Sequence, residues 1–216
     1  MKVSTDACLF GAVTDLSQSQ NLLDIGTGTG LLALMSAQRC EAQITGVELD
    51  HKAAEQARNN FKISPWSDRL FLSQQAIQDF ASISELRFDT IICNPPFFSN
   101  HQPSQEARRH IARHNDNLSF YDLGESVTKL LTSQGSFQVL IPTTELVRFR
   151  GAMEQQQLYL NKNISIRPST TKAANRQVLT FSRKEGAIKE EEICIRAGSD
   201  YSHAFIERLQ PFYLKL

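Results

Sequence analysis

A run of four residues combines an amide, two prolines and an aromatic ring. Residues 94–97 read Asn-Pro-Pro-Phe and follow an apolar run, residues 88–93, that predicts a β-strand. The prolines end this strand, because they have no amide hydrogen to extend a sheet. The side-chain oxygen of Asn94 and the carbonyl oxygen of Pro95 can then accept both N–H bonds of an amine and align its lone pair for attack. Phe97 offers a flat face on which a base can stack.

A glycine-rich turn nearer the amino end predicts a cofactor cradle. Asp24 stands two residues before Gly26, and Gly28 and Gly30 follow at alternate positions after an apolar run. Glycines let the backbone turn sharply and let a ligand lie against the main chain. The spacing differs from the G-x-G-x-x-G of dinucleotide sites, and the carboxylate would repel a pyrophosphate. The turn therefore favours a cationic ligand without phosphate, S-adenosylmethionine, over NAD.

Two polar residues after the next predicted strands complete the cofactor prediction. Glu48 ends the second strand, and we expect its carboxylate to accept hydrogen bonds from both ribose hydroxyls. The alternative for Glu48 is a helix-start charge beside Asp50. Gln75 follows the third strand, where a polar side chain can read the edge of an adenine. Many methyltransferases carry Asp at this point, so Gln75 departs from their pattern.

Alternating strands and helices must position these motifs. The apolar patterns predict seven strands, over residues 21–25, 43–49, 69–73, 88–93, 136–141, 158–166 and 177–183. They predict helices over residues 31–39, 50–61, 118–132 and 143–156. Residues 192–196 and 205–212 are not assigned to an element. Alternation of this kind is typical of an α/β fold with a mostly parallel sheet, and we expect residues 158–166 and 177–183 to close it as an antiparallel hairpin.

Length and composition are those of one α/β domain spanning residues 1–216. Apolar residues make up 41% and charged residues 21%, with a formal net charge of +0, so the molecule as a whole is not a polyanion binder. The four cysteines are isolated from one another, which predicts reduced thiols and no metal site. We find no leader sequence and no apolar run long enough to cross a bilayer, and expect a cytoplasmic protein.

Local clusters of basic residues offset the neutral total. No Asp or Glu occurs between Gln155 and Lys184, a stretch that includes Lys172 and Arg176. A second cluster, in a polar loop expected to overhang the site, contains Arg108, Arg109 and Arg113. Clustered cations can bind phosphates, and a solvated surface is the alternative interpretation of either cluster.

Several motifs together resemble one family. The glycine turn and residues 94–97 resemble the class of Rossmann-like methyltransferases that act on N6 of adenine, N4 of cytosine or N5 of glutamine. The opening, residues 1–12, is similar to the MKVGTDGVLLGAW of bacterial tRNA (adenine-N6)-methyltransferases, and residues 31–35 and 175–179 also match. The chain departs from that opening at Ser4, where glycine is usual, and at Val13, where tryptophan is usual.

The resemblance implies more than the residues alone do. It implies a class I S-adenosylmethionine-dependent methyltransferase that modifies the adenine 3′ of the anticodon in a valine tRNA. Apart from the resemblance, we expect a monomer. The resemblance also implies that the opening segment closes over the cofactor, so that Lys2, Thr5 and Asp6 line the cofactor pocket. The basic clusters are then the expected tRNA contacts.

Other functions share parts of this pattern. Protein-glutamine methyltransferases have Asn-Pro-Pro-aromatic, but usually carry a preceding helical domain for which we expect no room. Ribosomal RNA guanine-N2 methyltransferases resemble a duplicated domain, and DNA adenine methyltransferases usually need an added recognition domain. A silent cofactor-binding module is disfavoured, because it has no reason to keep the acceptor pair of Asn94 and Pro95.

Overall fold

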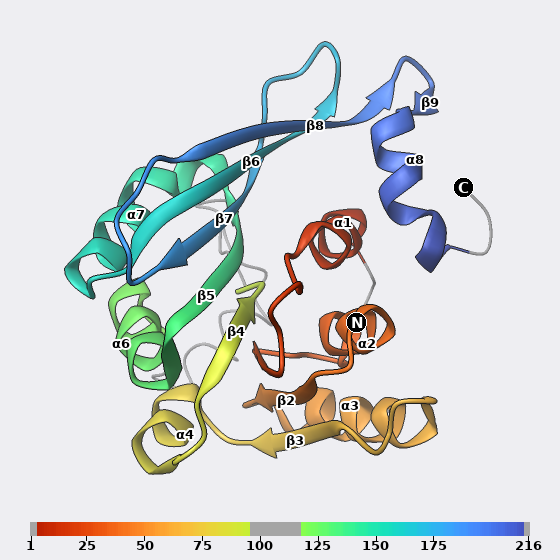
Figure 1. The fold of residues 1–216 in the computed structure, drawn as a ribbon. Helices are drawn as coiled ribbons and strands as arrows, with labels where there is room; N and C mark the ends of the chain where they lie inside the picture. The colour runs from red at the N-terminus through yellow and green to blue at the C-terminus, as the bar shows by residue number, and fades with distance from the viewer. Residues whose placement is uncertain (1–3, 96–117, 214–216) are drawn as a thin grey trace, which may run out of the picture.

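A single mixed β-sheet forms the centre of the molecule (Figure 1). The computed structural model describes residues 4–95 and 118–213. Within these residues the sheet has nine strands in the order β3-β2-β1-β4-β5-β7-β6-β8-β9. The strands are β1 (Asn21–Ile25), β2 (Gln43–Glu48), β3 (Leu70–Gln74), β4 (Phe88–Cys93), β5 (Leu131–Pro142), β6 (Tyr159–Ser169), β7 (Arg176–Ser182), β8 (Lys189–Ala197) and β9 (Asp200–Tyr201).

Strand direction divides the sheet into two parts. Strands β1 to β5 are mutually parallel, and β7 runs antiparallel to both β5 and β6. The seven predicted strands and the antiparallel closing pair are therefore confirmed. Strand β8, parallel to β6, and the short β9 extend the sheet beyond the prediction. The first half of β8 reads Lys-Glu-Glu-Glu, and this charged run hides the alternation of the buried Ile193 and Ile195.

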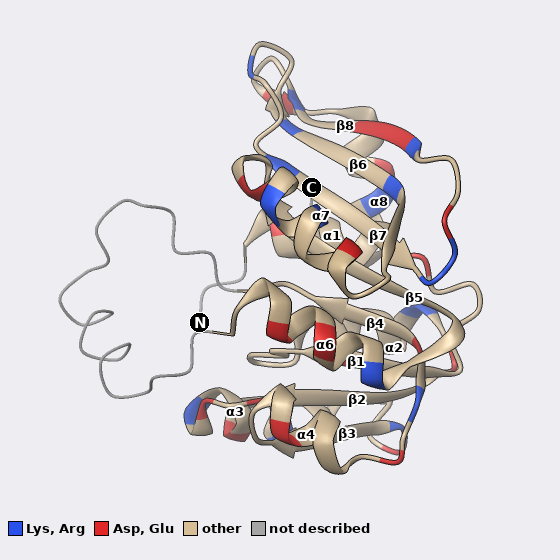
Figure 2. Cartoon of the chain, turned by 90° about the vertical axis from the view of Figure 1, so that its left-hand side faces the viewer, with Lys and Arg blue, Asp and Glu red and all other residues tan. Residues whose placement is uncertain are grey.

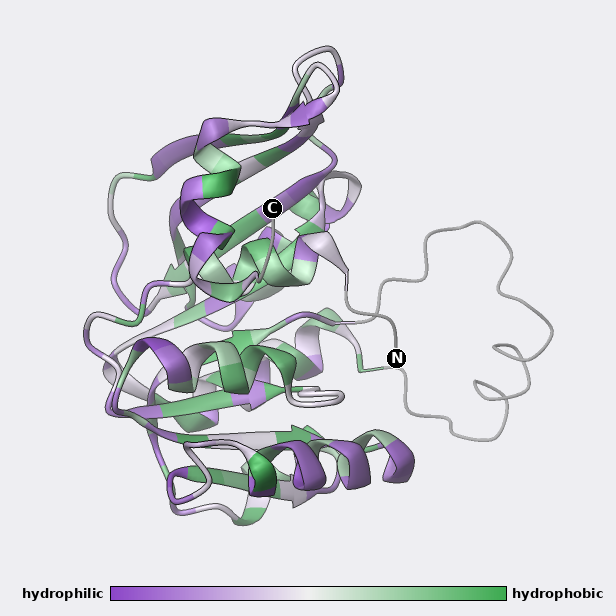
Figure 3. Ribbon diagram, turned by 90° about the vertical axis from the view of Figure 1, so that its right-hand side faces the viewer, coloured by the Kyte–Doolittle hydropathy of each residue, from purple (hydrophilic) through white to green (hydrophobic). Residues whose placement is uncertain are grey.

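Helices cover both faces of the sheet. They are α1 (Thr5–Val13), α2 (Leu31–Arg39), α3 (His51–Ile63), α4 (Ile77–Ile83), α6 (Phe120–Leu130), α7 (Leu146–Gln155) and α8 (His203–Leu209). One apolar core lies between the sheet and α1, α2, α3 and α8, and the other lies between the sheet and α4, α6 and α7. Alternate strand residues supply the two cores, as the pleat requires. Hydrophilic and hydrophobic bands alternate along α3, at the bottom of Figure 3, as expected for a helix with one buried face.

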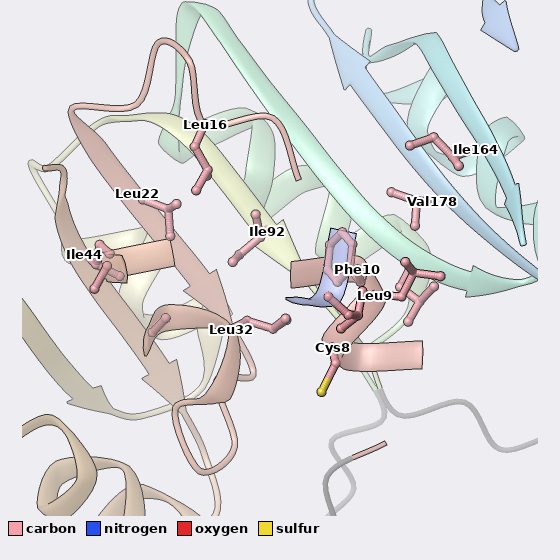
Figure 4. Packing of buried hydrophobic residues seen from close by; sticks show 14 of the residues in the cluster. Cys8, Leu9, Phe10, Leu16, Leu22, Leu32, Ile44, Ile92, Ile164 and Val178 are labelled. Carbon is pink, nitrogen blue, oxygen red and sulfur yellow. The ribbon is translucent and has the colours of Figure 1, made fainter. Parts of the chain in front are cut away.

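Helix α1 is, like α4, an element that the sequence patterns did not predict. Ser4 caps it, since its hydroxyl accepts a hydrogen bond from the Ala7 backbone N–H at 3.2 Å. Leu9 and Phe10 are completely buried, and Figure 4 shows Phe10 between Ile92 and Val178 of the sheet. Because both sides of this helix contribute to the core, its sequence lacks the amphipathic period that identifies a surface helix.

The remaining predictions about composition concern absences. The four cysteines are free, and Cys8 and Cys93 are buried. In the described ranges, no three His, Cys, Asp or Glu side chains are grouped to hold a metal ion. None of the helices in these ranges has the length and apolar character needed to cross a membrane.

Candidate functional site

The predicted site residues meet at the carboxyl edge of the parallel strands. Ile25 of β1 lies opposite both Val47 of β2 and Cys93 of β4. The residues that follow these three in the chain are Gly26, Glu48 and Asn94. The register therefore brings the glycine turn, the acidic residue and the Asn-Pro motif side by side, at the edge where open α/β sheets bind ligands.

The glycine turn after β1 needs glycine for two different reasons. The backbone φ angle is +66° at Gly26, +59° at Gly28 and +86° at Gly30, in the left-handed region that favours glycine. A Cβ added at Gly26 would meet nothing within 4 Å, whereas one at Gly30 would lie 2.5 Å from the Phe61 ring. Gly26 therefore faces open space at the strand edge, and Gly30 permits close packing against α3.

Glu48 braces the glycine turn. Its Oε2 accepts a hydrogen bond from the Gly28 backbone N–H and its Oε1 accepts one from the Asp50 N–H, both at 2.8 Å. The bond to Asp50, the residue that caps α3, agrees with the helix-start interpretation of Glu48. The bond to Gly28 adds a second function, which is to hold the glycine turn in place. Each carboxylate oxygen can accept a second hydrogen bond. The half-buried Glu48 thus keeps the capacity to accept bonds from ribose hydroxyls, which stays a prediction.

Asp24 is completely buried beneath the turn. Its Oδ2 accepts a hydrogen bond from the Thr27 hydroxyl at 2.6 Å, while Oδ1 has no partner in the described part of the chain. Burial raises the pKa of the Asp24 carboxyl to about 7, against the opposing effects of the Thr27 hydroxyl and the backbone N–H of Ala33, and the Glu48 charge adds to the rise. The Ala33 N–H lowers this pKa without satisfying Oδ1.

These features fit a cationic amino-acid ligand at this edge. A buried acceptor without a donor costs free energy, which a ligand that donates hydrogen bonds or carries positive charge would recover. Open space over Gly26 leaves room for such a ligand against the main chain. S-adenosylmethionine has an ammonium, a sulfonium and a ribose, and so matches the orphaned Asp24 oxygen, the open glycine and the free acceptor sites of Glu48.

The described part of the second motif is Asn94 and Pro95. Both are half-buried and follow β4 directly, whereas Phe97 lies outside the described residues. Beneath them Cys93 is buried, and burial raises the pKa of its thiol well above the usual value, with the charge of Asp24 adding to the effect. Cys93 therefore stays a protonated thiol and is unsuited to act as a nucleophile.

Three further cofactor predictions have distinct environments. The Gln75 side-chain N–H donates to the Ser73 hydroxyl at 2.8 Å, which turns this amide toward its own strand. Asp6 forms an ion pair with Arg176, with 3.2 Å between carboxylate oxygen and guanidinium nitrogen. Thr5, the first residue of α1, lines a cavity at the ends of β6 and β8. Lys2 lies outside the described residues.

The basic residues of the predicted clusters differ in their position on the sheet and in their ion-pair partners. Arg176 begins β7 and lies opposite Pro142, the last residue of β5, so it stands at the same sheet edge as Asn94. Lys162 and Arg167 form ion pairs with Glu191 and Glu192 on β8. Figure 2 shows the acidic part of β8 in red, with blue segments beside it on β8 itself and on β6. Arg108, Arg109 and Arg113 lie outside the described residues.

Two contributing residues were not predicted from the sequence. Thr27 donates a hydrogen bond to Oδ2 of Asp24, and Gly46 of β2 makes room for it, because a Cβ there would lie 2.9 Å from the Thr27 methyl group. Thr143 joins the end of β5 to the loop before β7, since its backbone N–H donates to the Asn175 carbonyl at 3.1 Å. The two threonines in the glycine turn were the available signal for the first of these.

Comparisons with known proteins agree with this geometry. A family model described as the methyltransferase small domain matches residues 6–119. The chain is 42% identical over 218 residues to a tRNA1(Val) (adenine(37)-N6)-methyltransferase of Pseudoalteromonas translucida, covering 100% of this chain and 93% of the relative. It is 39% identical over 221 residues to a protein of the same name from Bacteroides fragilis, covering 100% and 92%.

A solved structure shows the same fold at low identity. A predicted O-methyltransferase from Agrobacterium tumefaciens superposes with a TM-score of 0.74 at 17% identity, covering 95% of each chain. The class I methyltransferase fold is thereby confirmed.

Proposed function

The chain belongs to the family of tRNA1(Val) (adenine(37)-N6)-methyltransferases, and we propose that it transfers a methyl group from S-adenosylmethionine to N6 of adenine 37 in that tRNA. The observation that carries this proposal is the register of β1 with β4. It sets Gly26, at the open end of the cofactor cradle, beside Asn94, the predicted acceptor for the target amine. Methyl transfer needs both partners within contact distance, and a shared strand edge provides it.

The cofactor half of the reaction rests on the turn after β1. S-adenosylmethionine, when bound, would supply an electrophilic methyl group on its sulfonium. Glu48 would accept hydrogen bonds from the ribose, and Asp24 beneath the turn would favour a ligand of positive charge. Gly26 would leave the ligand in contact with the main chain.

The target half rests on Asn94 and Pro95. The lone pair of an adenine N6 is delocalised into the ring, which makes it a poor nucleophile. Acceptors on both N–H bonds favour a pyramidal nitrogen whose lone pair points at the methyl group, and alignment of this kind supplies most of the rate gain. No strong general base is needed, because the nitrogen loses its proton easily once methyl transfer has begun. Phe97 would stack on the base.

The RNA would be held mainly through its phosphates. Lys172 and Arg176 stand at the carboxyl edge with the target residues, and Arg108, Arg109 and Arg113 follow Phe97 in the chain. We infer that one subunit suffices for the reaction. Since its substrate would be tRNA, we place the enzyme in the cytoplasm.

Methyl transfer from labelled S-adenosylmethionine tests the proposal. We expect label in total tRNA and, by nucleoside mass spectrometry, N6-methyladenosine at position 37. Ribosomes and release factors serve as competing acceptors, and label in ribosomal guanine or in a glutamine side chain would replace the proposal by one of the two alternative activities.

Replacement of Asn94 tests the catalytic assignment. Asn94→Ala removes one acceptor while leaving the glycine turn intact, so we expect kcat to fall on the order of a hundredfold or more with cofactor affinity nearly unchanged. Isothermal calorimetry with S-adenosylhomocysteine provides the control. Unchanged turnover in this variant would remove Asn94 from the reaction.

A further inference from the structure

A cavity lies on the same edge of the sheet, away from the glycine turn. Its volume is about 340 Å³ and its lining includes Thr5, Ser169, Lys172, Arg196 and Tyr201. Ser169 ends β6 and lies opposite Arg196 of β8, which runs parallel to it, so the cavity opens at the carboxyl ends of these strands. In the order β4-β5-β7-β6-β8, three to four strand spacings separate it from Asn94, or roughly 14–19 Å.

Two cations that line this cavity, Lys172 and Arg196, differ from neighbouring cations in their ion pairing. Lys162, Arg167 and Arg176 are each engaged by a carboxylate, of Glu191, Glu192 and Asp6 in turn. Among the described residues, neither Lys172 nor Arg196 forms an ion pair, and both are exposed. The cavity that they line therefore concentrates the positive charge that remains uncompensated, although Asp200 stands next to Tyr201 in the chain.

Hydrogen bonds to main-chain carbonyls hold the loop that carries Lys172 in place. The Arg167 guanidinium donates to the carbonyl of Lys172 at 2.9 Å and to that of Thr170 at 2.5 Å. The Lys172 backbone N–H in turn donates to the Ser169 carbonyl at 3.1 Å. Arg167 thus holds the loop in place rather than facing a ligand, which reduces the ordering cost of binding at Lys172.

Arg196 is positioned by the hairpin that joins β8 to β9. It lies directly opposite Tyr201, with its guanidinium carbon 4.7 Å from the centre of the Tyr201 ring. That ring stacks on the buried Phe205, with 4.6 Å between ring centres. The Arg196 side chain also donates to the Ser199 carbonyl at 2.7 Å. Aromatic and main-chain contacts together orient a guanidinium that still has further N–H groups to donate.

We propose that this cavity binds a backbone phosphate of the substrate RNA, with Lys172 and Arg196 as its two cationic donors. The proposal rests on the proposed function, since it assumes an RNA substrate. A planar guanidinium beside a lysine is a combination suited to a phosphodiester. The separation from Asn94 is too great for the target nucleotide itself but suits a nearby nucleotide of the same loop or stem. The β8–β9 hairpin would thereby fix the register in which the RNA presents its base.

Filter binding of a valine tRNA anticodon stem-loop across a salt series tests the proposal. Lys172→Ala and Arg196→Ala should each weaken binding on the order of tenfold. Each should also flatten the log–log dependence on salt by about 0.7–0.9 for each phosphate that is no longer neutralised. Lys184→Ala is the matched control, because Lys184 follows β7 at the opposite edge of the sheet and bonds to Gln134. We expect its binding and salt dependence to match the wild type.

Further variants and the activity assay separate the possible failures. Arg196→Lys retains the charge and should keep most of the salt dependence; if it loses as much as Arg196→Ala, the role of Arg196 is structural and the proposal is wrong. In steady-state methylation both alanine variants should raise KM for RNA and leave kcat and S-adenosylhomocysteine affinity unchanged. Normal KM in a variant of an active enzyme would overturn the cavity assignment alone. A wild type that neither binds nor methylates the RNA would overturn the proposed function as well.

Discussion

The turn after β1 and the loops after β6 and β8 lie on one edge of one sheet, yet they are made of different groups. In the turn, Gly26 and Gly28 shape the surface, and the Glu48 carboxylate is bound by backbone N–H groups. In the loops, the long cationic side chains of Lys172 and Arg196 form the surface. Main-chain carbonyls accept hydrogen bonds from Arg196 and from Arg167, which braces the loop.

The difference follows from the two kinds of ligand. A small cofactor is recognised by shape, so its cradle is made of main chain whose position cannot adjust. A polyanion is recognised largely through charge, so its surface needs cations that reach outward and respond to salt. Substitutions should therefore act through sterics and burial at the first region and through electrostatics at the second.

The largest expected effect concerns the buried acid of the cradle. Folding raises the pKa of Asp24 to about 7, so the folded state binds an extra proton and loses stability as pH rises from about 4 to 7. Asp24→Asn does not titrate. Its free energy of unfolding relative to the wild type should rise across that window, by about 3 kcal/mol between pH 5 and pH 8. Urea unfolding at pH 5 and pH 8, without cofactor, measures this; the same difference at both values would contradict it.

Two glycine substitutions sharpen the distinction between shape and packing. Gly30→Ala forces a Cβ against Phe61 and should lower the free energy of unfolding by about 3 kcal/mol. Gly26→Ala meets no atom and should cost only the backbone strain, about 1–2 kcal/mol, while its methyl group enters the space assigned to the cofactor. Thermal unfolding and calorimetry with S-adenosylhomocysteine separate these effects. Wild-type affinity in Gly26→Ala would place the cofactor elsewhere.

The double variant Lys172→Ala with Arg176→Ala tests the charged region. We expect weaker tRNA binding at every sequence, with a salt dependence shallower by nearly one log–log unit for each phosphate left without its cation. Cofactor affinity should stay at the wild-type value, because the glycine turn is untouched. An unaltered slope would leave Arg108, Arg109 and Arg113 as the remaining candidates for the RNA surface.

The smallest effect is expected at the cap of α1. Ser4→Ala should cost about 1 kcal/mol of stability, since it removes the acceptor for the Ala7 N–H. Ser4→Gly should cost only a few tenths of a kcal/mol, because glycine is tolerated at a helix N-cap. A thermal-unfolding series of the two variants measures the difference, and equal losses would show that the hydroxyl contributes little.

The sequence predicted most of the sheet and the place of the site, for identifiable reasons. Strands such as β1 and β4 consist mainly of apolar residues, and the glycine turn and Asn94 directly follow them. The pairing of Asp6 with Arg176 could not be predicted, because it depends on the spatial approach of distant segments. The second bond of Glu48, to Gly28, depends on a side-chain rotamer that spacing does not reveal. A single domain over residues 1–216 stays a prediction.

The packing of α1 has a consequence for synthesis on the ribosome. Phe10 of α1 and Phe205 of α8 are both fully buried in one core, and Asp15 exchanges two hydrogen bonds of 2.8 Å with Gln138 of β5. The apolar residues of α1 therefore find these partners only after the distant segment that forms α8 has been made. Until then they stay exposed, and contacts between such distant residues close slowly. We expect the docking of α1 to be a late step in folding, and this apolar segment to be the one that most needs shielding by a chaperone.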